Sequence, residues 1–304
     1  MAGMKSSNQR RSHGKETPSY SAIAVRSMTA SDLLFADSVR ALAGWNQTLD
    51  DWQRLLTLSP EGCFIAEWNG TPAGTATTIS YDEKVAWIGM LLVHPDFRSR
   101  GVGRALLERC LEYFERRGIS CIKLDATPQG QPLYDRFGFK EEWRLTRWET
   151  RCLPQVAPTE QKNVYPCTEH QASAVAELDR TAFGVRRQPL LRTLLSGCER
   201  ALLYKSSHGI AGYGIVRQGS RAYYLGPLVA DNPSTAAGLV AALLRDSAGK
   251  SIYWDIPDQN NEAVALAKHL GFNVQRHFRR LYLGTSNIQG CCSTYFGIAD
   301  PALG

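Results

Sequence analysis

The stretch RSRGVGRALL, residues 98–107, places two glycines and three arginines directly before an apolar helix. Glycine lets a ligand approach the backbone without a Cβ in the way. Amides at a helix N-terminus point outward, and the helix dipole favours an anion there. The stretch therefore predicts either a phosphate-binding loop or an ordinary basic loop before a helix.

Two common phosphate loops are excluded by the same residues. A Walker A loop requires Gly-Lys-Ser/Thr, whereas Gly103 is followed by Arg-Ala. A dinucleotide fingerprint requires a first glycine directly after the strand, whereas seven residues separate Val93 from Gly101, and its third glycine is replaced by leucine. What remains is the pattern Arg-x-x-Gly-x-Gly between a strand and a long helix.

The segments around this loop alternate between strand and helix patterns. The Asn69-Gly70 pair predicts a hairpin turn between two strands, and Thr48 with Asp51 resembles a capping box at a helix start. The order from residue 20 is β-α-α-β-β-β-α-β-α-β, which predicts an α/β (α+β) fold with a mixed sheet. The predicted segments are 20–28, 29–44, 48–58, 62–70, 71–82, 84–95, 101–118, 120–128, 131–139 and the strand that follows.

Composition and charge exclude several classes of protein. The chain has 304 residues, enough for about two domains, with 43% hydrophobic and 21% charged residues as in ordinary globular proteins. Half of the net charge of +6 lies in residues 1–18, so we expect no nucleic-acid partner. No run of about 18 apolar residues occurs, so we expect no membrane-spanning helix.

The N-terminal residues and the cysteines indicate a cytoplasmic protein. Residues 1–20 lack the apolar core of a secretory signal, and their composition predicts a disordered basic tail. The eight cysteines form no CxxC pair and no zinc-type spacing. We therefore expect reduced thiols and no bound metal.

Two motifs together resemble a known family. LLVHPDFRSRGVGRALL (91–107), followed about 25 residues later by LYDRFGF (133–139), is similar to the GNAT superfamily of acyl-CoA N-acyltransferases. The resemblance directly covers residues 21–150. It implies acetyl-CoA as the acyl donor and a primary amine as the usual acceptor.

The resemblance assigns the cofactor site to two neighbouring segments. The backbone of Leu91, Leu92 and Val93 would pair with the pantetheine amides. The amides from Ser99 to Arg104 would hold the pyrophosphate, with added charge from arginine side chains. The predicted cofactor-binding residues of this loop are Arg98, Ser99, Arg100, Gly101, Val102, Gly103 and Arg104.

The same resemblance gives Tyr134 the role of general acid toward the leaving thiolate. The glutamate that many members carry on the strand before the loop is absent from VAWIGMLLV. Asp125 either accepts the proton of the amine or is a cap or turn residue. Trp45 and Asn46 either contact the acceptor or form a plain corner between two helices.

The second half repeats the first in a degenerate form. YYLGPLVADNPSTAAGLVAALL and IYWDIPDQNNEAVALAKHLGF mirror the two motifs. The alignment places Thr235, Gly238 and Val240 at the positions of Arg98, Gly101 and Gly103, and Ala267 at that of Tyr134. The predicted organisation is a tail (1–20), a catalytic GNAT domain (21–150), a linker (151–163), a degenerate GNAT-like domain (164–285) and a C-terminal tail (286–304).

These patterns favour an N-acetyltransferase for a small amine, with an active first domain and a second domain that closes the acceptor site. Two alternatives stay open. One is an acetyltransferase for protein lysines or N-termini, which requires an open groove, and the other is a non-catalytic acyl-CoA sensor. The sequence does not decide whether the chain forms a homo-oligomer.

Overall fold

The computed structural model describes residues 22–151, 162–285, 288 and 290–304. The expected tail 1–20 and nearly all of the expected linker lie outside them. The first half has the predicted order of elements. They are β1 (Ile23–Ser27), α1 (Leu33–Leu42), α2 (Leu49–Leu58), β2 (Cys63–Trp68), β3 (Thr71–Tyr81), β4 (Val85–Val93), α3 (Val102–Arg116), β5 (Cys121–Ala126), α4 (Gln131–Arg136) and β6 (Lys140–Thr150).

The second half repeats this order and adds one strand, which confirms the predicted internal repeat. Its elements are β7 (Val164–Pro166), α5 (Ala172–Phe183), α6 (Gln188–Ser196), β8 (Arg200–Ser206), β9 (Gly209–Arg217), β10 (Tyr223–Ala230), α7 (Pro233–Leu243), β11 (Ile252–Pro257), α8 (Asn261–His269), β12 (Asn273–Gly284) and β13 (Tyr295–Gly297). Short 3-10 helices η1 (Ala30–Asp32), η2 (Pro95–Phe97) and η3 (Glu169–Gln171) precede α1, α3 and α5.

Local sequence signals account for the elements that precede the site. Thr48 and Asp51 form the predicted capping box at the start of α2. Asn69 and Gly70 adopt φ angles of 49° and 78°, the left-handed values that a two-residue hairpin turn requires between β2 and β3. The apolar run of β4 is buried along most of its length, as expected for a strand covered on both faces.

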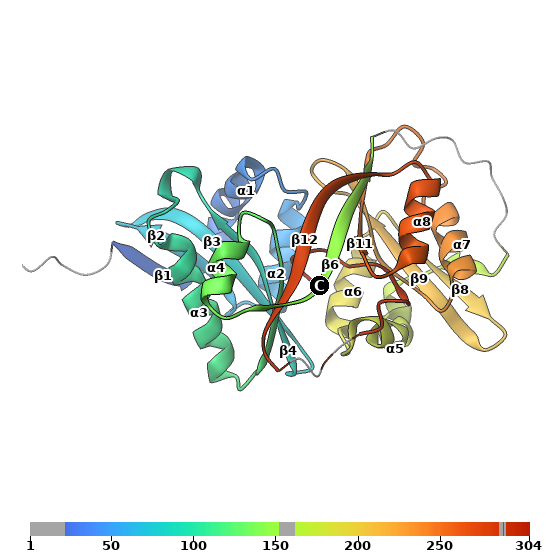
Figure 1. Cartoon of the computed structure of the whole chain (residues 1–304), viewed down its shortest axis with the longest axis horizontal. Coiled ribbons are helices and arrows are strands. Elements are labelled where there is room, and N and C mark those ends of the chain that lie inside the picture. Colours follow the sequence, from blue (N-terminus) through green and yellow to red (C-terminus); the bar gives the residue numbers. More distant parts are fainter. Residues whose placement is uncertain (1–21, 152–161, 286–287, 289) are drawn as a thin grey trace, which may run out of the picture.

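The strands of both halves form one continuous sheet (Figure 1). Among the described residues its order is β1-β2-β3-β4-β5-β12-β6-β11-β10-β9-β8-β7, with β13 beside β10. The last strand of the repeated order, β6 in the first half and β12 in the second, is therefore exchanged between the halves. β12, from the second half, pairs with β5, and β6, from the first half, pairs with β11.

Because β6 and β12 are exchanged between the halves, the expected domain boundaries in the sequence do not divide the sheet into two parts. Residues 279–284 of β12 pair antiparallel with β5, and residues 273–282 also pair antiparallel with β6 at the centre of the sheet. The expected division into 21–150 and 164–285 therefore follows the order of the chain but not the sheet. In the sheet, β12 of the second segment lies between β5 and β6 of the first.

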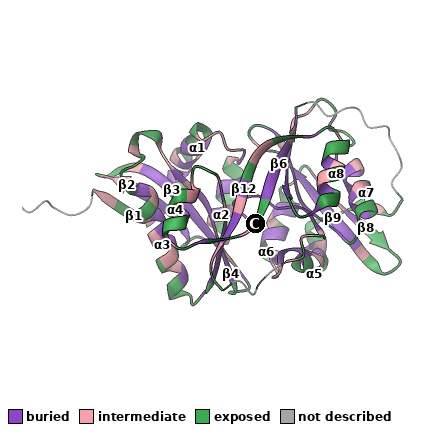
Figure 2. Cartoon of the chain, viewed as in Figure 1, coloured by how far each residue is buried: buried purple, intermediate pink, exposed green. Residues whose placement is uncertain are grey.

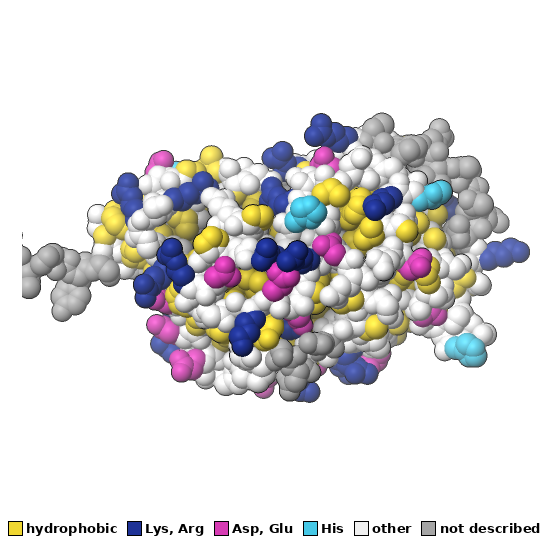
Figure 3. Space-filling model, in the orientation of Figure 1, with side chains coloured by type: hydrophobic (Ala, Val, Ile, Leu, Met, Phe, Trp, Pro, Cys, Tyr) yellow, Lys and Arg dark blue, Asp and Glu magenta, His cyan; other side chains and the backbone are white. Residues whose placement is uncertain are grey.

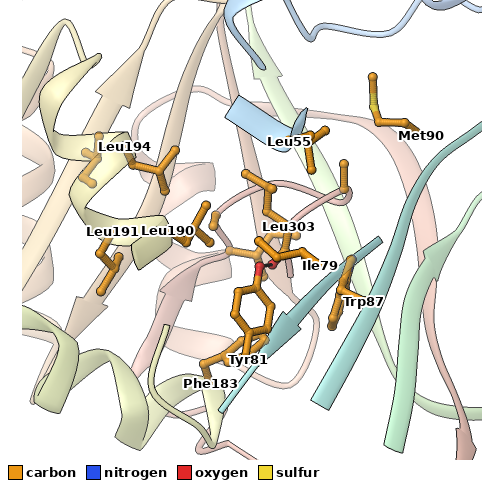
Figure 4. Packing of buried hydrophobic residues seen from close by; sticks show 14 of the residues in the cluster. Leu55, Ile79, Tyr81, Trp87, Met90, Phe183, Leu190, Leu191, Leu194 and Leu303 are labelled. Atoms are coloured by element: carbon orange, nitrogen blue, oxygen red, sulfur yellow. Dashed lines mark hydrogen bonds between the residues drawn. The ribbon is translucent and has the colours of Figure 1, made fainter. Parts of the chain in front are cut away.

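The expectation of a C-terminal tail at 286–304 is wrong for residues 295–304. This segment, which we call the C-terminal insert, is almost wholly buried between the two halves. Leu303 lies among Ile79 and Tyr81 of β3 and Leu190 of α6 (Figure 4). The Tyr81 hydroxyl donates a hydrogen bond to the Leu303 carbonyl at 2.7 Å. The insert thus packs the halves together.

Burial and charge follow the pattern of a folded globular protein (Figure 2 and Figure 3). Figure 2 shows the buried residues concentrated on the strands and on the inner sides of the helices. On the face shown in Figure 3, Lys and Arg side chains are spread among Asp and Glu and form no continuous basic patch. Such a patch is the usual feature of a nucleic-acid binding surface.

None of the helices in the described ranges has both the length and the apolar character needed to span a bilayer.

Candidate active site

The first half opens between β4 and β5. These parallel strands pair only where 85–87 lie beside 121–123. A bulge then interrupts β4 at Met90, whose φ of 48° lies in the left-handed region that L residues rarely adopt. Because a bulge bends a strand and ends its pairing, residues 91–93 keep β3 on one edge and have no strand on the other within the described chain.

A tight loop connects β4 to α3. Ser99 and Gly101 adopt φ angles of 59° and 89°, and Gly101 is the N-cap of α3 with no capping side chain. The amides at the start of the helix have no acceptor inside it. They lie at the positive end of the helix dipole, where an anion is favoured. The loop therefore has the geometry that the sequence predicts for phosphate binding.

Gly103 borders the space between the end of β4 and α4. A Cβ built on Gly103 would lie 3.5 Å from Val93, 3.6 Å from Leu133 and 3.8 Å from Leu91, which are ordinary contact distances. The side chains of Leu92 and Val102 are instead buried in the core. A branched side chain at position 103 would therefore occupy the space beside Val93, Leu133 and Leu91.

The three predicted arginines lie around this loop on its exposed side. Arg98 Nε donates to the Val93 carbonyl at 3.3 Å. The Arg100 guanidinium lies 5.3 Å from the centre of the Trp68 ring. Arg104 forms an exposed ion pair with a glutamate one turn along α3. Each side chain already contacts a protein group, so the backbone amides are the ligands that the loop offers without rearrangement.

Tyr134 lies in α4, facing the opening. Its ring packs edge-on against Phe139, with 5.8 Å between the ring centres, and the Phe139 amide donates to the Tyr134 carbonyl at 3.2 Å. The side chain is 8% exposed, and burial raises the pKa of its phenol above the ordinary value. The phenol therefore keeps its proton at neutral pH, as a proton donor must.

A cavity joins Tyr134 to the free edge of β4. It encloses about 460 Å³ of space outside the protein atoms, part of it open to solvent. Both halves and the C-terminal insert contribute to its wall. The lining residues are Trp45, Gln47, Ile88, Gly89, Met90, Leu91, Asp125, Thr127, Tyr134, Arg147, Arg276, Phe278, Pro301 and Ala302.

The wall includes functional candidates that sequence reasoning missed. Arg147, Arg276 and Phe278 reach the cavity because β6 and β12 are exchanged between the halves. Ala302 reaches it because the C-terminal insert lies against Gly89, where an added Cβ would meet the Ala302 carbonyl at 2.6 Å. No local pattern in the sequence indicates either arrangement.

Asp125 lines the cavity, but a buried arginine occupies its carboxylate. Arg280 Nε and Nη2 donate to the two oxygens at 2.8 Å each. The guanidinium is also stacked between Trp87 and Trp143, with 4.5 and 4.0 Å to their ring centres. Burial raises the pKa of Asp125, and Arg280 opposes that rise.

The second half contains the same ion pair. Asp255 of β11 accepts hydrogen bonds from Arg147 of β6 at 2.7 and 2.6 Å. Each pair thus joins an aspartate of one half to an arginine on the strand exchanged from the other. Asp125 lies inside β5 and is therefore neither a cap nor a turn residue. Its ion pair with Arg280 has an equivalent in the second half, which has no tyrosine at the position of Tyr134.

Trp45 and Asn46, in the turn between α1 and α2, lie in different surroundings. Trp45 lines the cavity, as acceptor contact requires. Asn46 is buried in the contact between the halves, where its Nδ2 donates to the Ala222 carbonyl and its Oδ1 accepts from the amides of Arg221 and Ala222, all at 3.0 Å. Asn46 is therefore outside the cavity wall, and the next residue, Gln47, lies in it.

The loop between strand and helix is shortened in the second half. Only residues 231 and 232 separate β10 from α7, whereas residues 94–101 separate β4 from α3. Asn232 caps α7 by accepting from the Thr235 amide at 2.9 Å, and Pro233 has no N–H to offer.

The predicted pairing of Thr235 with Arg98 is wrong. A Cβ on Gly212 would meet Thr235 and Leu239 as one on Gly74 would meet Val102 and Leu106, so Thr235 takes the place of Val102. Gly238 and Val240 lie further along α7 and therefore do not match Gly101 and Gly103.

The gap between β10 and β11 is filled by the chain itself. β13 pairs antiparallel with β10 beyond the point where β10 and β11 separate. The Trp254 indole in β11 donates to the Phe296 carbonyl at 2.9 Å. Ala267 takes the place of Tyr134, since the Phe272 amide donates to its carbonyl as that of Phe139 does to Tyr134. The second half therefore has neither an open edge nor a proton donor at these positions.

Two family models match the chain, one in each half. A model described as "Acetyltransferase (GNAT) family" matches residues 30–139, and one described as "Acetyltransferase (GNAT) domain" matches residues 175–297. Holothin acyltransferase from a Pseudoalteromonas species is 27% identical over 243 residues, covering 79% of this chain and 81% of that protein.

Solved structures share the arrangement of both halves. A Pyrococcus horikoshii protein assigned as an acetyltransferase is 27% identical, with a TM-score of 0.82, and the match covers 97% of this chain and 100% of that chain. A tandem GNAT protein from the clavulanic acid biosynthesis pathway is 17% identical, with a TM-score of 0.62 over 86% of this chain and 98% of that chain, which shows a common fold.

Proposed function

Because the chain belongs to the GNAT superfamily of acyl-CoA-dependent N-acyltransferases and contains two GNAT domains, we propose that it transfers an acetyl group from acetyl-CoA to a primary amine of a small molecule. The reaction takes place in the first half. The observation that carries this proposal is the cavity that connects Tyr134 with the free edge of β4.

In the first half, some residues bind the cofactor and Tyr134 transfers the proton. The edge of Leu91–Val93 binds the pantetheine arm, and the amides of 99–104 bind the pyrophosphate at the start of α3. The amine nitrogen bonds to the acyl carbon as the bond from that carbon to sulfur breaks. Tyr134 gives its proton to the sulfur and regains one, by way of water, from the nitrogen.

Asp125 holds β5 and β12 together in this proposal and takes no proton. Arg280 already occupies both of its oxygens. Deprotonation of the amine then falls to solvent water in the cavity.

The second half is proposed to bind no acyl-CoA. Its helix start is capped by Asn232, its strand gap holds β13, and Ala267 has no proton to give. Its role is to complete the acceptor pocket. Arg276, Phe278 and Ala302 form that part of the wall.

A pocket that is partly enclosed supports a small acceptor over a protein chain. Among the described residues, the second half and the C-terminal insert contribute walls to it, which narrows the space available to a polypeptide. The similarity to a holothin acyltransferase also supports a small-molecule amine. A buried tyrosine in the cavity argues against a sensor that only binds acyl-CoA.

The test is an assay of acetyl-CoA with a panel of small amines and, separately, with lysine-containing peptides, read by release of free thiol. We expect turnover with members of the small-amine panel. Turnover with peptides alone would establish the protein acetyltransferase alternative. Binding of acetyl-CoA with no acceptor-dependent thiol release would establish the sensor.

Gly103→Val is expected to weaken acetyl-CoA binding by on the order of tenfold or more, the range for forcing methyl groups into filled space. Gly103→Ala is the matched control, because its single Cβ meets neighbours only at ordinary contact distance. Calorimetric titration of the folded variants measures both. Equal affinity for the valine and alanine variants would remove this loop from the cofactor site.

A further inference from the structure

The cavity wall includes an arginine, Arg276, that forms no ion pair and no hydrogen bond with any residue that the structure describes. Arg276 of β12 lies directly opposite Arg147 of β6 in the strand register. Like charges in this position repel each other. Arg147 is neutralised by Asp255, whose second oxygen also accepts a hydrogen bond from the Tyr224 hydroxyl at 3.1 Å. Both oxygens of Asp255 are thus engaged by other groups, and none of the described residues forms a hydrogen bond or an ion pair with Arg276.

The remaining charged groups of the wall are balanced. Asp125 and Arg280 neutralise each other, as do Asp255 and Arg147. Burial lowers the pKa of Arg276, the positive charges of Arg147 and Arg221 act in the same direction, and Asp255 opposes them only in part. A half-buried guanidinium without a partner is costly in a folded protein. An anion bound in the cavity would remove that cost.

A second polar group in the cavity also lacks a partner. Gln47 is 5% exposed, and its Nε2 donates to Asp300 Oδ1 at 2.8 Å. Its Oε1 is buried, and no donor to it exists in the described part of the chain. Buried carbonyl oxygens are nearly always hydrogen-bonded. Gln47 is therefore ready to accept a hydrogen bond from an N–H group of a ligand.

Resting on the function proposed above, we propose that the acceptor is an amine that also carries a carboxylate. Arg276 binds the carboxylate through its planar fork of donors, which matches the two oxygens of that group. Gln47 accepts a hydrogen bond from the amine end. The aromatic side chains of Trp45 and Phe278 border the space between, so the body of the molecule is apolar.

The test uses the full-length chain, acetyl-CoA and matched amines that differ only in the carboxylate. The pairs are phenylalanine with 2-phenylethylamine, 4-aminobutyrate with butylamine, and lysine with cadaverine. We expect the carboxylate-bearing member of at least one pair to have a kcat/KM about 10- to 100-fold higher, the range for a hydrogen bond to a charged group. Arg276→Gln should remove this preference and leave the KM for acetyl-CoA unchanged.

Arg279→Gln is the control, because Arg279 lies on the same strand but forms an exposed ion pair with Glu141. It should keep the preference for the carboxylate. Equal kcat/KM for both members of every pair, or an equal loss for both members in Arg276→Gln, would overturn the inference.

A binding measurement separates this inference from the proposed function. If no amine is acetylated, the proposed function fails, and calorimetric titration with the same six compounds in the presence of CoA still decides the inference. Binding of a carboxylate-bearing compound that is lost in Arg276→Gln supports it. Equal binding by the wild type and Arg276→Gln overturns it.

Discussion

Replacing Tyr134 by Phe is expected to lower kcat by about 10²-fold or more, the usual scale for one acid–base group, with little change in the affinity for acetyl-CoA. The ring still packs against Phe139, so only the proton donor is lost. Steady-state kinetics and a separate binding titration measure the two effects. Tyr113→Phe is the matched control, because Tyr113 lies on α3 outside the cavity wall.

The pH profile gives a second readout for Tyr134. A general acid works while it is protonated, and burial raises the pKa of this phenol above its ordinary value of about 10. Loss of the acid should therefore cause no fall in kcat as pH rises from 7 to 10. Wild-type turnover in Tyr134→Phe would assign the proton transfer to another group or to water.

Asp125→Asn is expected to lower the free energy of unfolding by about 3–5 kcal/mol, the cost of leaving one partner of a buried ion pair alone. The Asp125 side chain is 0% exposed and that of Arg280 is 4% exposed, so water does not compensate for the loss. The pair joins β5 to the exchanged strand β12. Urea unfolding at constant pH measures the change.

Asp255→Asn provides the matched comparison, because it breaks the equivalent pair in the half without the tyrosine. If Asp125 is structural, both variants lose similar stability, and the folded fraction of Asp125→Asn keeps most of its kcat. A loss of kcat in folded Asp125→Asn far beyond that of Asp255→Asn would restore the base assignment.

Local features of the first half were predictable because local interactions determine them. The Asn69-Gly70 turn requires left-handed backbone that these residues tolerate, and the capping box of Thr48 and Asp51 involves neighbours in the chain. The glycine loop and Tyr134 belong to motifs whose spacing follows from one strand, one turn and one helix. The repeat was visible because both halves keep the same order of elements.

The long-range features were not predictable from these patterns. β6 and β12 have equivalent positions in the two halves. The sequence patterns of these strands do not indicate that β12 pairs with β5 and that β6 pairs with β11. The insertion of residues 295–304 between the halves likewise depends on tertiary packing. For that reason Arg276 and Ala302 were missed as cavity residues.

The repeat alignment shows a further limit of sequence reasoning. Gly238 matched Gly101 by letter, but the loop in the second half is six residues shorter, so Gly238 lies inside α7. The match of Ala267 with Tyr134 is supported by equivalent backbone hydrogen bonds. The carbonyl of each residue accepts from the amide five residues further along the chain. The alignment of Ala267 with Tyr134 is correct because three residues (137–139 and 270–272) separate the helix from the next strand in both halves. The alignment of Gly238 with Gly101 is wrong because the loops before α3 and α7 differ in length.

Calorimetric titration of the full-length chain with acetyl-CoA tests the central claim most directly, namely that the first half holds the acyl-CoA site and the second half completes the pocket. The titration counts sites, and Gly103→Val then shows which half contains them. We predict one acetyl-CoA per chain, with binding strongly weakened by Gly103→Val. A fit to two equivalent sites, or a single site that Gly103→Val leaves unchanged, would contradict the account.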